Sequence, residues 1–423
     1  MHRERERERE RELYASLMAK PSPNLFFAVF FVSLLSLLLI FISYATSSPR
    51  HPRVLPRSAN LPNPLDAPPP RVAYFISGSN GDGARIKRLL YAVYHPRNQY
   101  LLHLDLRASQ DQREDLAVWA KSVEVFVAAK NVGVVGKADA VNLDGSTPIA
   151  AVLHGAAILL RWCHGWDWFV NLGPSDYPII TQDDFLHVLS FLPRELDLNF
   201  IEHSSDIGWK EYQRIVQVTV DPGLYLGTKG VLFTGSHKRK QPRAYKFFTG
   251  SPWVILSRKF VEFTILGLDN LPRTLLMYFS NTKSSHRGYF QTLACNTRKF
   301  SNSMINSNLR FVMWDNPPGP EPRNLKKSDF RKMISSGAAF AGPFLQNDGA
   351  LDQIDALILH RGKGRVAPGG WCLGGRRFGG DPCQVWGDID ILRPSPAGKR
   401  FERLLLRLIP NRPSNSSTPS IHR

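Results

Sequence analysis

Several side chains suited to acid–base chemistry lie together in the segment NFIEHSSDIGWKEYQR, residues 199–214. Glu202 and Glu211 offer carboxylates that can remove a proton from a hydroxyl group. Lys210 and Arg214 offer cations that can hold an anionic ligand. The segment follows an apolar run, and loops that follow strands often carry functional sites in α/β proteins. A solvated charged loop explains the same pattern, so both interpretations stay open.

A second acidic motif is GDID, in which Asp388 and Asp390 form an Asp-x-Asp pair. Such a pair can hold a divalent metal against a diphosphate. Asp390 can equally pair with Arg393, and so short a match arises easily by chance. We therefore expect no metal site and no required cofactor, with Mn²⁺ or Mg²⁺ kept as the less favoured alternative.

The four cysteines are Cys163, Cys295, Cys372 and Cys383, and none of them forms a C-x-x-C pair that would indicate structural zinc. In an oxidising compartment, the ten residues between Cys372 and Cys383 make these two the natural disulfide, worth about 3 kcal/mol. Cys163 and Cys295 are then expected to be buried thiols. Asn415 begins the one N-glycosylation sequon, Asn-Ser-Ser.

Composition narrows the class of partner. The chain has 423 residues, is 43% hydrophobic and 11% aromatic, and is therefore expected to fold into one or two domains. Its formal charge of +18 favours an anionic partner, such as a sugar nucleotide, an acidic polysaccharide, lipid headgroups or nucleic acid. No basic motif interleaved with aromatic residues is present, so we expect no nucleic-acid binding.

The N-terminal part has the pattern of a membrane anchor. Residues 25–45 contain no charge and would form a helix about 31 Å long, close to the thickness of the hydrocarbon core. We expect a cytosolic tail at 1–24, a transmembrane helix at 25–45 and a proline-rich, extended stem at 46–70. A cleaved signal peptide is the competing interpretation. A folded domain at 71–409 and a disordered tail at 410–423 complete the expected order.

The start of the folded domain alternates between strand and helix patterns. Residues 71–78 and 99–105 predict buried strands, and residues 83–94 between them place apolar side chains on one helical face. VEVFVAA, residues 123–129, predicts a further strand, and residues 147–162 predict a long apolar helix. This order indicates an α/β fold with parallel strands. The glycine-rich SGSNGDG has the spacing of neither a dinucleotide loop nor a P-loop.

Longer motifs carry a family resemblance. They are YFISGSNGDGARIKRLLYAVYHPRNQYLLHLD, GKADAV, WDWFVNLGPSDYP, TGSPWVILSR, MWDNPP and APGGWCLGG with DPCQVWGDIDILRP. With these motifs in register from about residue 71 to 408, the chain resembles the plant branch of the core-2/I-branching β-1,6-N-acetylglucosaminyltransferase family. Within that branch it is most similar to the β-glucuronosyltransferases of arabinogalactan.

The resemblance implies a single-pass type II protein of the Golgi membrane with its catalytic domain in the lumen. It also implies a GT-A-like fold with a mixed, mainly parallel sheet flanked by helices. The expected reaction is inverting transfer of glucuronate or N-acetylglucosamine from a UDP-sugar to a β-galactan or related arabinogalactan-type acceptor. A homo- or hetero-oligomer with other glycosyltransferases is a further expectation.

Two positions depart from the family pattern. Family members carry SPEGYFHT where this chain has SHRGYFQT, so Arg287 stands where the catalytic Glu is expected. Arginine cannot accept a proton, because its pKa lies above about 12. The family's FARKF supplies a lysine to the donor diphosphate, whereas this chain reads FAGPF with Pro343 at that place.

Three interpretations of Arg287 stay open. The residue binds an anionic group of a different substrate, or it marks a protein that binds glycans without transferring sugar, or it lies on an exposed turn and the base lies elsewhere. The second interpretation gives the alternative function, a catalytically silent partner or scaffold of active glycosyltransferases. Under the third, Glu202 and Glu211 are the candidate bases.

The remaining candidate residues belong to the acceptor and donor sides of the site, and the resemblance places three of them. It puts the acceptor at Glu202, Lys210 and Arg214, and Trp314 is a further candidate because it could stack on a sugar ring. On the donor side we expect Gly78 and Asp105 to lie near the uridine or ribose. Cations that could replace the missing lysine are Arg361, Lys363, Lys399 and Arg400.

Overall fold

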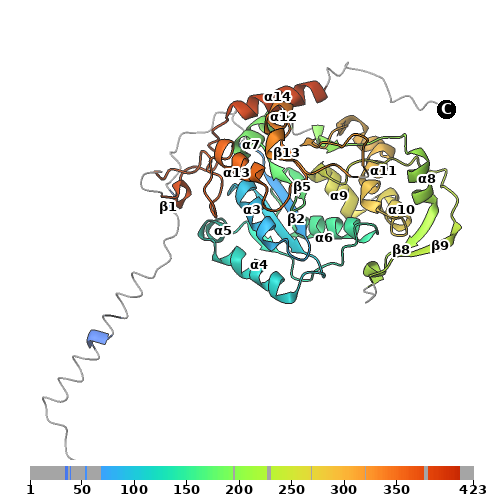
Figure 1. The fold of residues 1–423 in the computed structure, drawn as a ribbon, viewed down its shortest axis with the longest axis horizontal. Coiled ribbons are helices and arrows are strands. Elements are labelled where there is room, and N and C mark those ends of the chain that lie inside the picture. Colours follow the sequence, from blue (N-terminus) through green and yellow to red (C-terminus); the bar gives the residue numbers. More distant parts are fainter. Residues whose placement is uncertain are drawn as a thin grey trace, which may run out of the picture. The chain divides into compact units, whose positions relative to one another are not determined.

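The computed structural model describes residues 34–36, 39, 53–54, 68–193, 196–225, 230–267, 269–319, 321–375 and 380–409 (Figure 1). The expected anchor, the stem and the tail with Asn415 fall wholly or largely outside these residues. Within the described part, no helix combines the length and the hydropathy that a membrane span requires. The chain divides into a unit of residues 1–51 and a unit of residues 52–423, and the second unit contains the elements below.

A seven-stranded sheet forms the centre of the second unit. Its strands, in spatial order, are β11 (Met304–Ile305), β7 (Asn199–Ile201), β10 (Val254–Ser257), β5 (Trp168–Leu172), β2 (Val72–Gly78), β3 (Gln99–Leu104) and β4 (Val132–Val134). Neighbouring strands are parallel except β10, which runs antiparallel to both β5 and β7. The predicted mixed, mainly parallel sheet is therefore confirmed.

Helices cover both faces of this sheet. They are α3 (Gly83–Val93), α4 (Gln110–Ser122), α5 (Glu124–Ala129), α6 (Thr147–Trp162), α7 (Gln182–Ser190), α8 (Gly208–Val216), α9 (Arg258–Leu266), α10 (Asn270–Phe279), α11 (Tyr289–Asn296), α12 (Phe330–Ser336), α13 (Gly349–Leu357) and α14 (Pro396–Leu408). Alternate side chains of β2 point to opposite faces. Tyr74 and Ile76 pack in one core with Ile86 of α3, whereas Phe75 packs in the other with Ile149 of α6.

Shorter elements surround the main sheet. Its smaller companions are the sheet of β12 (Arg310–Phe311), β13 (Phe340–Ala341) and β6 (Tyr177–Pro178), the pair β8 (Gln217–Val220) and β9 (Phe233–Lys238), and the pair β1 (Arg53–Val54) and β14 (Val385–Trp386). The 3-10 segments are η2 (Pro222–Tyr225), η3 (Ser285–Arg287), η4 (Arg298–Ser303), η5 (Lys327–Asp329) and η7 (Pro382–Gln384).

The strand predicted for VEVFVAA is wrong, because residues 124–129 form helix α5. The helix ends at Lys130, whose φ is 53° and whose N–H donates to the Phe126 carbonyl. Phe126 is buried against Tyr94 and Trp119, which a helical backbone allows. A short run that is apolar throughout does not distinguish a helix from a strand, and here the tertiary packing decides.

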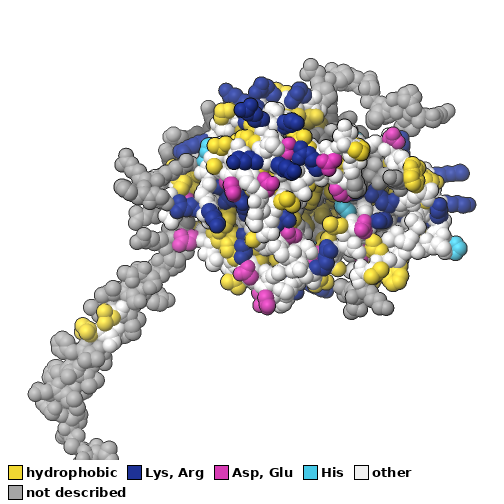
Figure 2. All heavy atoms as spheres, viewed as in Figure 1, with side chains coloured by type: hydrophobic (Ala, Val, Ile, Leu, Met, Phe, Trp, Pro, Cys, Tyr) yellow, Lys and Arg dark blue, Asp and Glu magenta, His cyan; other side chains and the backbone are white. Residues whose placement is uncertain are grey.

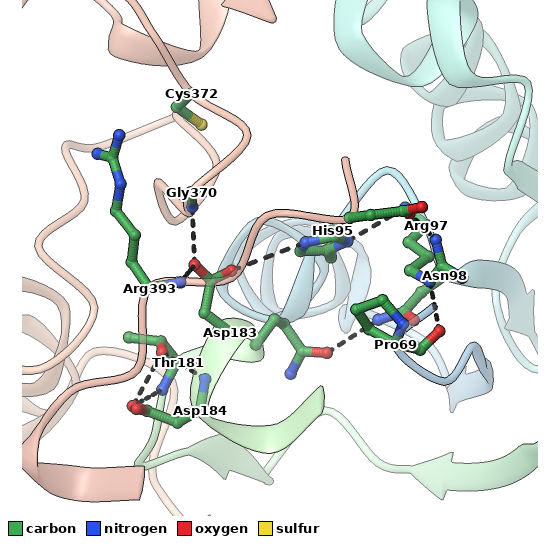
Figure 3. Close-up of polar contacts among 12 residues, drawn as sticks. Pro69, His95, Arg97, Asn98, Thr181, Asp183, Asp184, Gly370, Cys372 and Arg393 are labelled. Atoms are coloured by element: carbon green, nitrogen blue, oxygen red, sulfur yellow. Dashed lines mark hydrogen bonds and ion pairs between the residues drawn. The ribbon is translucent and has the colours of Figure 1, made fainter. Parts of the chain in front are cut away.

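A buried polar cluster attaches the C-terminal segment to the sheet domain (Figure 3). Asp183 of α7 accepts hydrogen bonds through Oδ2 from the backbone N–H groups of Gly370 and Arg393, each at 2.7 Å. The neighbouring Asp184 accepts from the backbone N–H of Ser395 at 2.5 Å. A disulfide joins Cys372 to Cys383 in the same segment, with their Cα atoms 4.4 Å apart.

Candidate active site

A cavity of about 260 Å³ opens where β2, β3 and β5 end. We call it the strand-end cavity and define it by its lining residues Phe75, Ser77, Gly78, Ser79, Asp82, Asp105, Arg107, Val141, Leu143, Pro148, Ala151, Val152, Asn171, Leu172, Gly173, Pro174, Ser175, Pro252, Trp253 and His286. Ligands of open α/β sheets bind at the carboxyl ends of the strands. The strand-end cavity therefore lies where a nucleotide-type ligand is expected.

The loop after β2 shapes one wall of the cavity. A Cβ atom at Gly78 would lie 2.7 Å from Cγ of Pro174 and 2.9 Å from Cβ of Asp82. Only glycine allows this close approach between the ends of β2 and β5. Asp82 then closes the turn, because its Oδ2 accepts from the Ser79 N–H at 2.9 Å. The glycine expected at the donor side thus lies in the cavity wall.

Asp105 is a carboxylate held in place at the end of β3. It is only 1% exposed, and its Oδ1 accepts hydrogen bonds from Ser79 Oγ at 2.9 Å and from the Arg107 N–H at 3.0 Å. The Arg107 guanidinium contacts Oδ2 at 3.1 Å and is itself 57% exposed. The sequence analysis missed Arg107, although it stands two residues after Asp105. Together they give the cavity an ordered acceptor and an accessible cation.

Glu202 follows β7 and lies beside the strand-end cavity without lining it. A Cβ atom at Gly250 would lie 1.9 Å from the Glu202 carbonyl oxygen, and the Gly250 N–H donates to the Arg287 carbonyl at 2.9 Å. Gly250 therefore brings the backbones of Glu202 and Arg287 close together. The Glu202 carboxylate accepts from Asn308 Nδ2 at 2.7 Å, and partial burial raises its pKa.

Arg287, at the position of the expected base, forms an ion pair with Glu321. It lies close to Arg214 of α8, whose pKa is lowered to about 10 by burial and by the positive charge of Arg287. The expected acceptor residue Arg214 and the unexpected Arg287 are therefore neighbours. Lys210 and Glu211 also belong to α8, but their side chains lie outside the described part of the chain.

His286 is a residue of the cavity that the sequence analysis did not select. It lines the cavity next to Arg287, and its Nδ1 is enclosed without a hydrogen-bond partner among the described residues. Burial and the charges of Arg287 and Arg214 lower its pKa to about 3. The available signal was its place directly before Arg287 in SSHRGYFQTLACN.

The cations expected to replace the family lysine do not line the strand-end cavity. Arg361 lines a separate cavity of about 740 Å³, and its guanidinium donates to both carboxylate oxygens of Asp355 and to the Tyr177 hydroxyl. Lys363 borders that separate cavity too. Lys399 and Arg400 belong to α14, which packs on α7 and α12. Figure 2 shows that Lys and Arg side chains gather on the surface at α14.

Pro343 lies beside a different cation. Arg85 of α3 donates to the carbonyl of Phe344, the residue after Pro343, at 2.9 Å. It also pairs with Asp82, which lines the strand-end cavity, at 3.3 Å. Arg85 thus connects the segment that contains Pro343 to Asp82 in the cavity wall. Trp314 is 48% exposed and does not line the cavity.

The Asp-x-Asp motif lies away from the strand-end cavity. Asp390 forms an ion pair with Arg97, not with Arg393, and Arg97 precedes the amino end of β3. The cavity lies at the carboxyl end of the same strand. Among the described residues, no group of three or more His, Cys, Asp or Glu side chains could hold a metal ion.

Comparisons with known proteins match the sequence to a family. The model of the family described as "Core-2/I-Branching enzyme" matches residues 72–334. Beta-glucuronosyltransferase GlcAT14A of Arabidopsis thaliana is 51% identical over 341 residues, which cover 81% of this chain and 76% of that protein. Beta-glucuronosyltransferase GlcAT14C of the same plant is 42% identical over 382 residues, covering 89% and 93%.

A solved structure titled "WbbM bifunctional glycosytransferase apo structure" matches at 12% identity with a TM-score of 0.35, covering 70% of this chain and 50% of that chain. The match to the family model and the identities to plant relatives are independent of that structure. This chain therefore belongs to the core-2/I-branching enzyme family and is a glycosyltransferase.

Proposed function

We propose that the protein transfers glucuronate or N-acetylglucosamine, with inversion, from a UDP-sugar to a β-galactan or related arabinogalactan-type glycan. The names of the plant relatives support the choice of glucuronate as the first donor to test. The proposal includes a GT-A-like arrangement and a type II Golgi protein anchored by residues 25–45. It also allows association with other glycosyltransferases.

The observation that carries the proposal is the buried Asp105 beside the strand-end cavity, held by Ser79 and Arg107. A fixed carboxylate can accept hydrogen bonds from the ribose hydroxyls of a nucleotide. The apolar wall formed by Leu172 and Trp253 can pack against the uracil ring. Arg107 is an exposed cation among the residues that line the cavity, and its positive charge can stabilise the diphosphate that leaves with the uridine.

The acceptor glycan would approach from the side of Glu202 and Arg214. These residues lie beside Gly250 and Arg287, which are close in sequence to the cavity residues Pro252 and His286. Partial burial favours the protonated form of the Glu202 carboxylate, which makes it suited to hydrogen bonding with sugar hydroxyls. Trp314 offers an exposed indole for stacking on a sugar ring.

The proposal is tested with the full chain purified in detergent. UDP-glucuronate, UDP-N-acetylglucosamine and other UDP-sugars are each supplied with β-galactan oligosaccharides, and products are measured by mass spectrometry. Transfer from one donor, lost in Asp105→Asn, is the expected result. Arg403→Ala changes an exposed residue on α14 and is the matched control. Equal activity of Asp105→Asn and wild type would contradict the assignment of the cavity.

A second candidate function follows from Arg287 and Pro343, the two positions that lack family side chains. A catalytically silent partner or scaffold would bind the galactan oligosaccharides without forming product. Recovery of transfer in the double variant Arg287→Glu with Pro343→Lys would then favour the silent interpretation. Product formation by wild type that is abolished in Glu202→Gln or Glu211→Gln would favour catalysis with a relocated carboxylate base.

A further inference from the structure

His286 is held rigidly in the wall of the strand-end cavity. The Ser285 N–H donates to the Gly145 carbonyl at 3.2 Å, and the Ser284 N–H donates to the Asp144 carbonyl at 2.8 Å. On the other side, the Arg287 carbonyl accepts from the Gly250 N–H. Ser284 has a φ of 48°, in the left-handed region, which turns the chain sharply before η3. The backbone that carries the imidazole is therefore held by hydrogen bonds on both sides.

The two acidic side chains that line the cavity already have hydrogen-bond and ion-pair partners. Asp82 accepts from the Ser79 N–H and pairs with Arg85, while Asp105 accepts from Ser79 and Arg107. His286 differs from both, because its Nδ1 is enclosed and has no hydrogen-bond partner in the described part of the chain. Among the described residues that line the cavity, His286 supplies an imidazole whose Nδ1 has no hydrogen-bond partner.

The surrounding charges keep this imidazole neutral. The charged groups that face it are Arg287 next to it, Arg214 of α8 and Asp144 of the loop before α6. Burial disfavours the imidazolium most, and the Arg287 and Arg214 charges add to this effect, so a nitrogen lone pair is available at physiological pH. An anionic UDP-sugar in the cavity offsets the guanidinium charges and makes proton uptake easier during the reaction.

We propose that His286 is the proton acceptor of the transfer reaction, in place of the carboxylate expected at residue 287. The inference rests on the proposed function and names the base of that same site. The acceptor hydroxyl gives its proton to the imidazole while its oxygen forms a bond to the anomeric carbon. The bond from that carbon to the β-phosphate oxygen breaks, and its electron pair leaves on UDP. The imidazolium then releases the proton to solvent.

The position of the residue supports this role. His286 lines the cavity, whereas Arg287, one residue later, does not. The Arg287 guanidinium is paired with Glu321 and cannot accept a proton. Glu202 accepts from Asn308 and does not line the cavity. The base is therefore displaced by one position along the same segment.

The test uses the full chain with the UDP-sugar that supports transfer in the donor panel. His286→Ala should lower kcat by about 100-fold, the usual contribution of general base catalysis, and should leave the Kd for the UDP-sugar within about twofold of wild type. Free imidazole should restore transfer in a concentration-dependent manner, which a structural role would not produce. His187→Asn, on α7 and away from the cavity, is the control for loss of a histidine.

A second variant distinguishes loss of transfer caused by misfolding from loss of transfer caused by removal of the base. His286→Pro combined with Arg287→Glu places the family pair at both positions and should transfer sugar faster than His286→Pro alone. Two results would overturn this inference and leave the proposed function standing, provided that wild type is active. In the first, His286→Ala keeps more than a tenth of the wild-type kcat. In the second, free imidazole does not restore transfer by His286→Ala. Wild type inactive with every donor would overturn both.

Discussion

The Arg287 guanidinium forms an ion pair with Glu321, a residue 34 positions later in the chain. The Glu321 side chain is 65% exposed, and the Arg287 side chain is 29% exposed. The pair therefore lies at the rim of the candidate site, where solvent screens the attraction. A cation paired with a carboxylate of another segment thus stands where the resemblance predicts the catalytic carboxylate.

Glu321→Gln should change the free energy of unfolding by less than about 1 kcal/mol, because exposed ion pairs contribute little. Urea unfolding of the full chain measures this. Glu262→Gln is the matched control, since it breaks the partly exposed pair between Arg258 and Glu262 at 2.7 Å. A loss above about 2 kcal/mol in Glu321→Gln alone would show that the Arg287 pair is structural.

Gly78→Ala should weaken binding of the UDP-sugar and lower stability. The added methyl group would meet the Pro174 ring at 2.7 Å and Asp82 Cβ at 2.9 Å, and neither is the end of a flexible side chain. The loops after β2 and β5 must then move apart, which distorts the strand-end cavity. We expect Kd for the UDP-sugar to rise by at least about tenfold, as a shift of about 1.4 kcal/mol gives. Titration calorimetry measures this Kd.

Gly83→Ala is the control for this prediction. A Cβ atom at Gly83 meets no heavy atom within 4 Å, and the residue begins helix α3. Alanine is a better helix former than glycine, so this variant should keep its Kd and gain up to about 1 kcal/mol of stability. Equal Kd values for the two variants would contradict the role given to Gly78.

The sequence predicted strands at 71–78 and 99–105, because continuous apolar runs between turn residues are typical of buried parallel strands, and the structure has them at Val72–Gly78 and Gln99–Leu104. It also predicted Gly78 and Asp105 for the donor side, since Gly78 ends the first of these strands and Asp105 follows the second. The surroundings of Arg361, Lys399 and Arg400, the cations predicted for the donor side, could not be derived in this way. Their surroundings depend on helices α13 and α14, which pack through contacts distant in sequence.

His286 shows the limit of pattern reasoning in the site. Its neighbours in the cavity come from the segments after β2, β3 and β5 and from Trp253, which are far apart in the sequence. The enclosure of a nitrogen without a hydrogen-bond partner results from that packing, so it cannot be predicted from the sequence. The same holds for α5, where a run of valines and alanines fits a helix or a strand equally well.

Removal of the disulfide by Cys372→Ser with Cys383→Ser should lower the free energy of unfolding by about 3 kcal/mol. The bridge closes a loop with a sequence separation of 11, and cross-linking such a loop restricts the unfolded chain. Urea unfolding of the oxidised wild type and the double variant measures the difference. Cys163→Ser, which replaces a free thiol, is the control and should lower the free energy of unfolding by less than the double variant. Equal losses in the two proteins would contradict the prediction.

Asp183 should make stability depend on pH. Burial raises its pKa to about 6, although the backbone N–H groups of Gly370 and Arg393 oppose the rise. The folded state then keeps this proton at a pH where the unfolded chain has lost it. The stabilisation is complete below about pH 4 and is lost as pH rises through about 6, so this group favours the folded state at pH 5 over pH 7 by about 1.5 kcal/mol.

The comparison with Asp183→Asn isolates this contribution. The nearby His95 has a pKa lowered to about 3 by burial and by Arg97. Its contribution therefore lowers the free energy of unfolding as pH falls, which opposes the effect of Asp183. Asn keeps one oxygen to accept from the Gly370 and Arg393 N–H groups but cannot titrate in this range. Urea unfolding at pH 5 and pH 7 should therefore show a more favourable change on acidification in wild type than in the variant. Identical changes would contradict this prediction, because they would mean that Asp183 gains no proton between pH 7 and pH 5 in the folded protein.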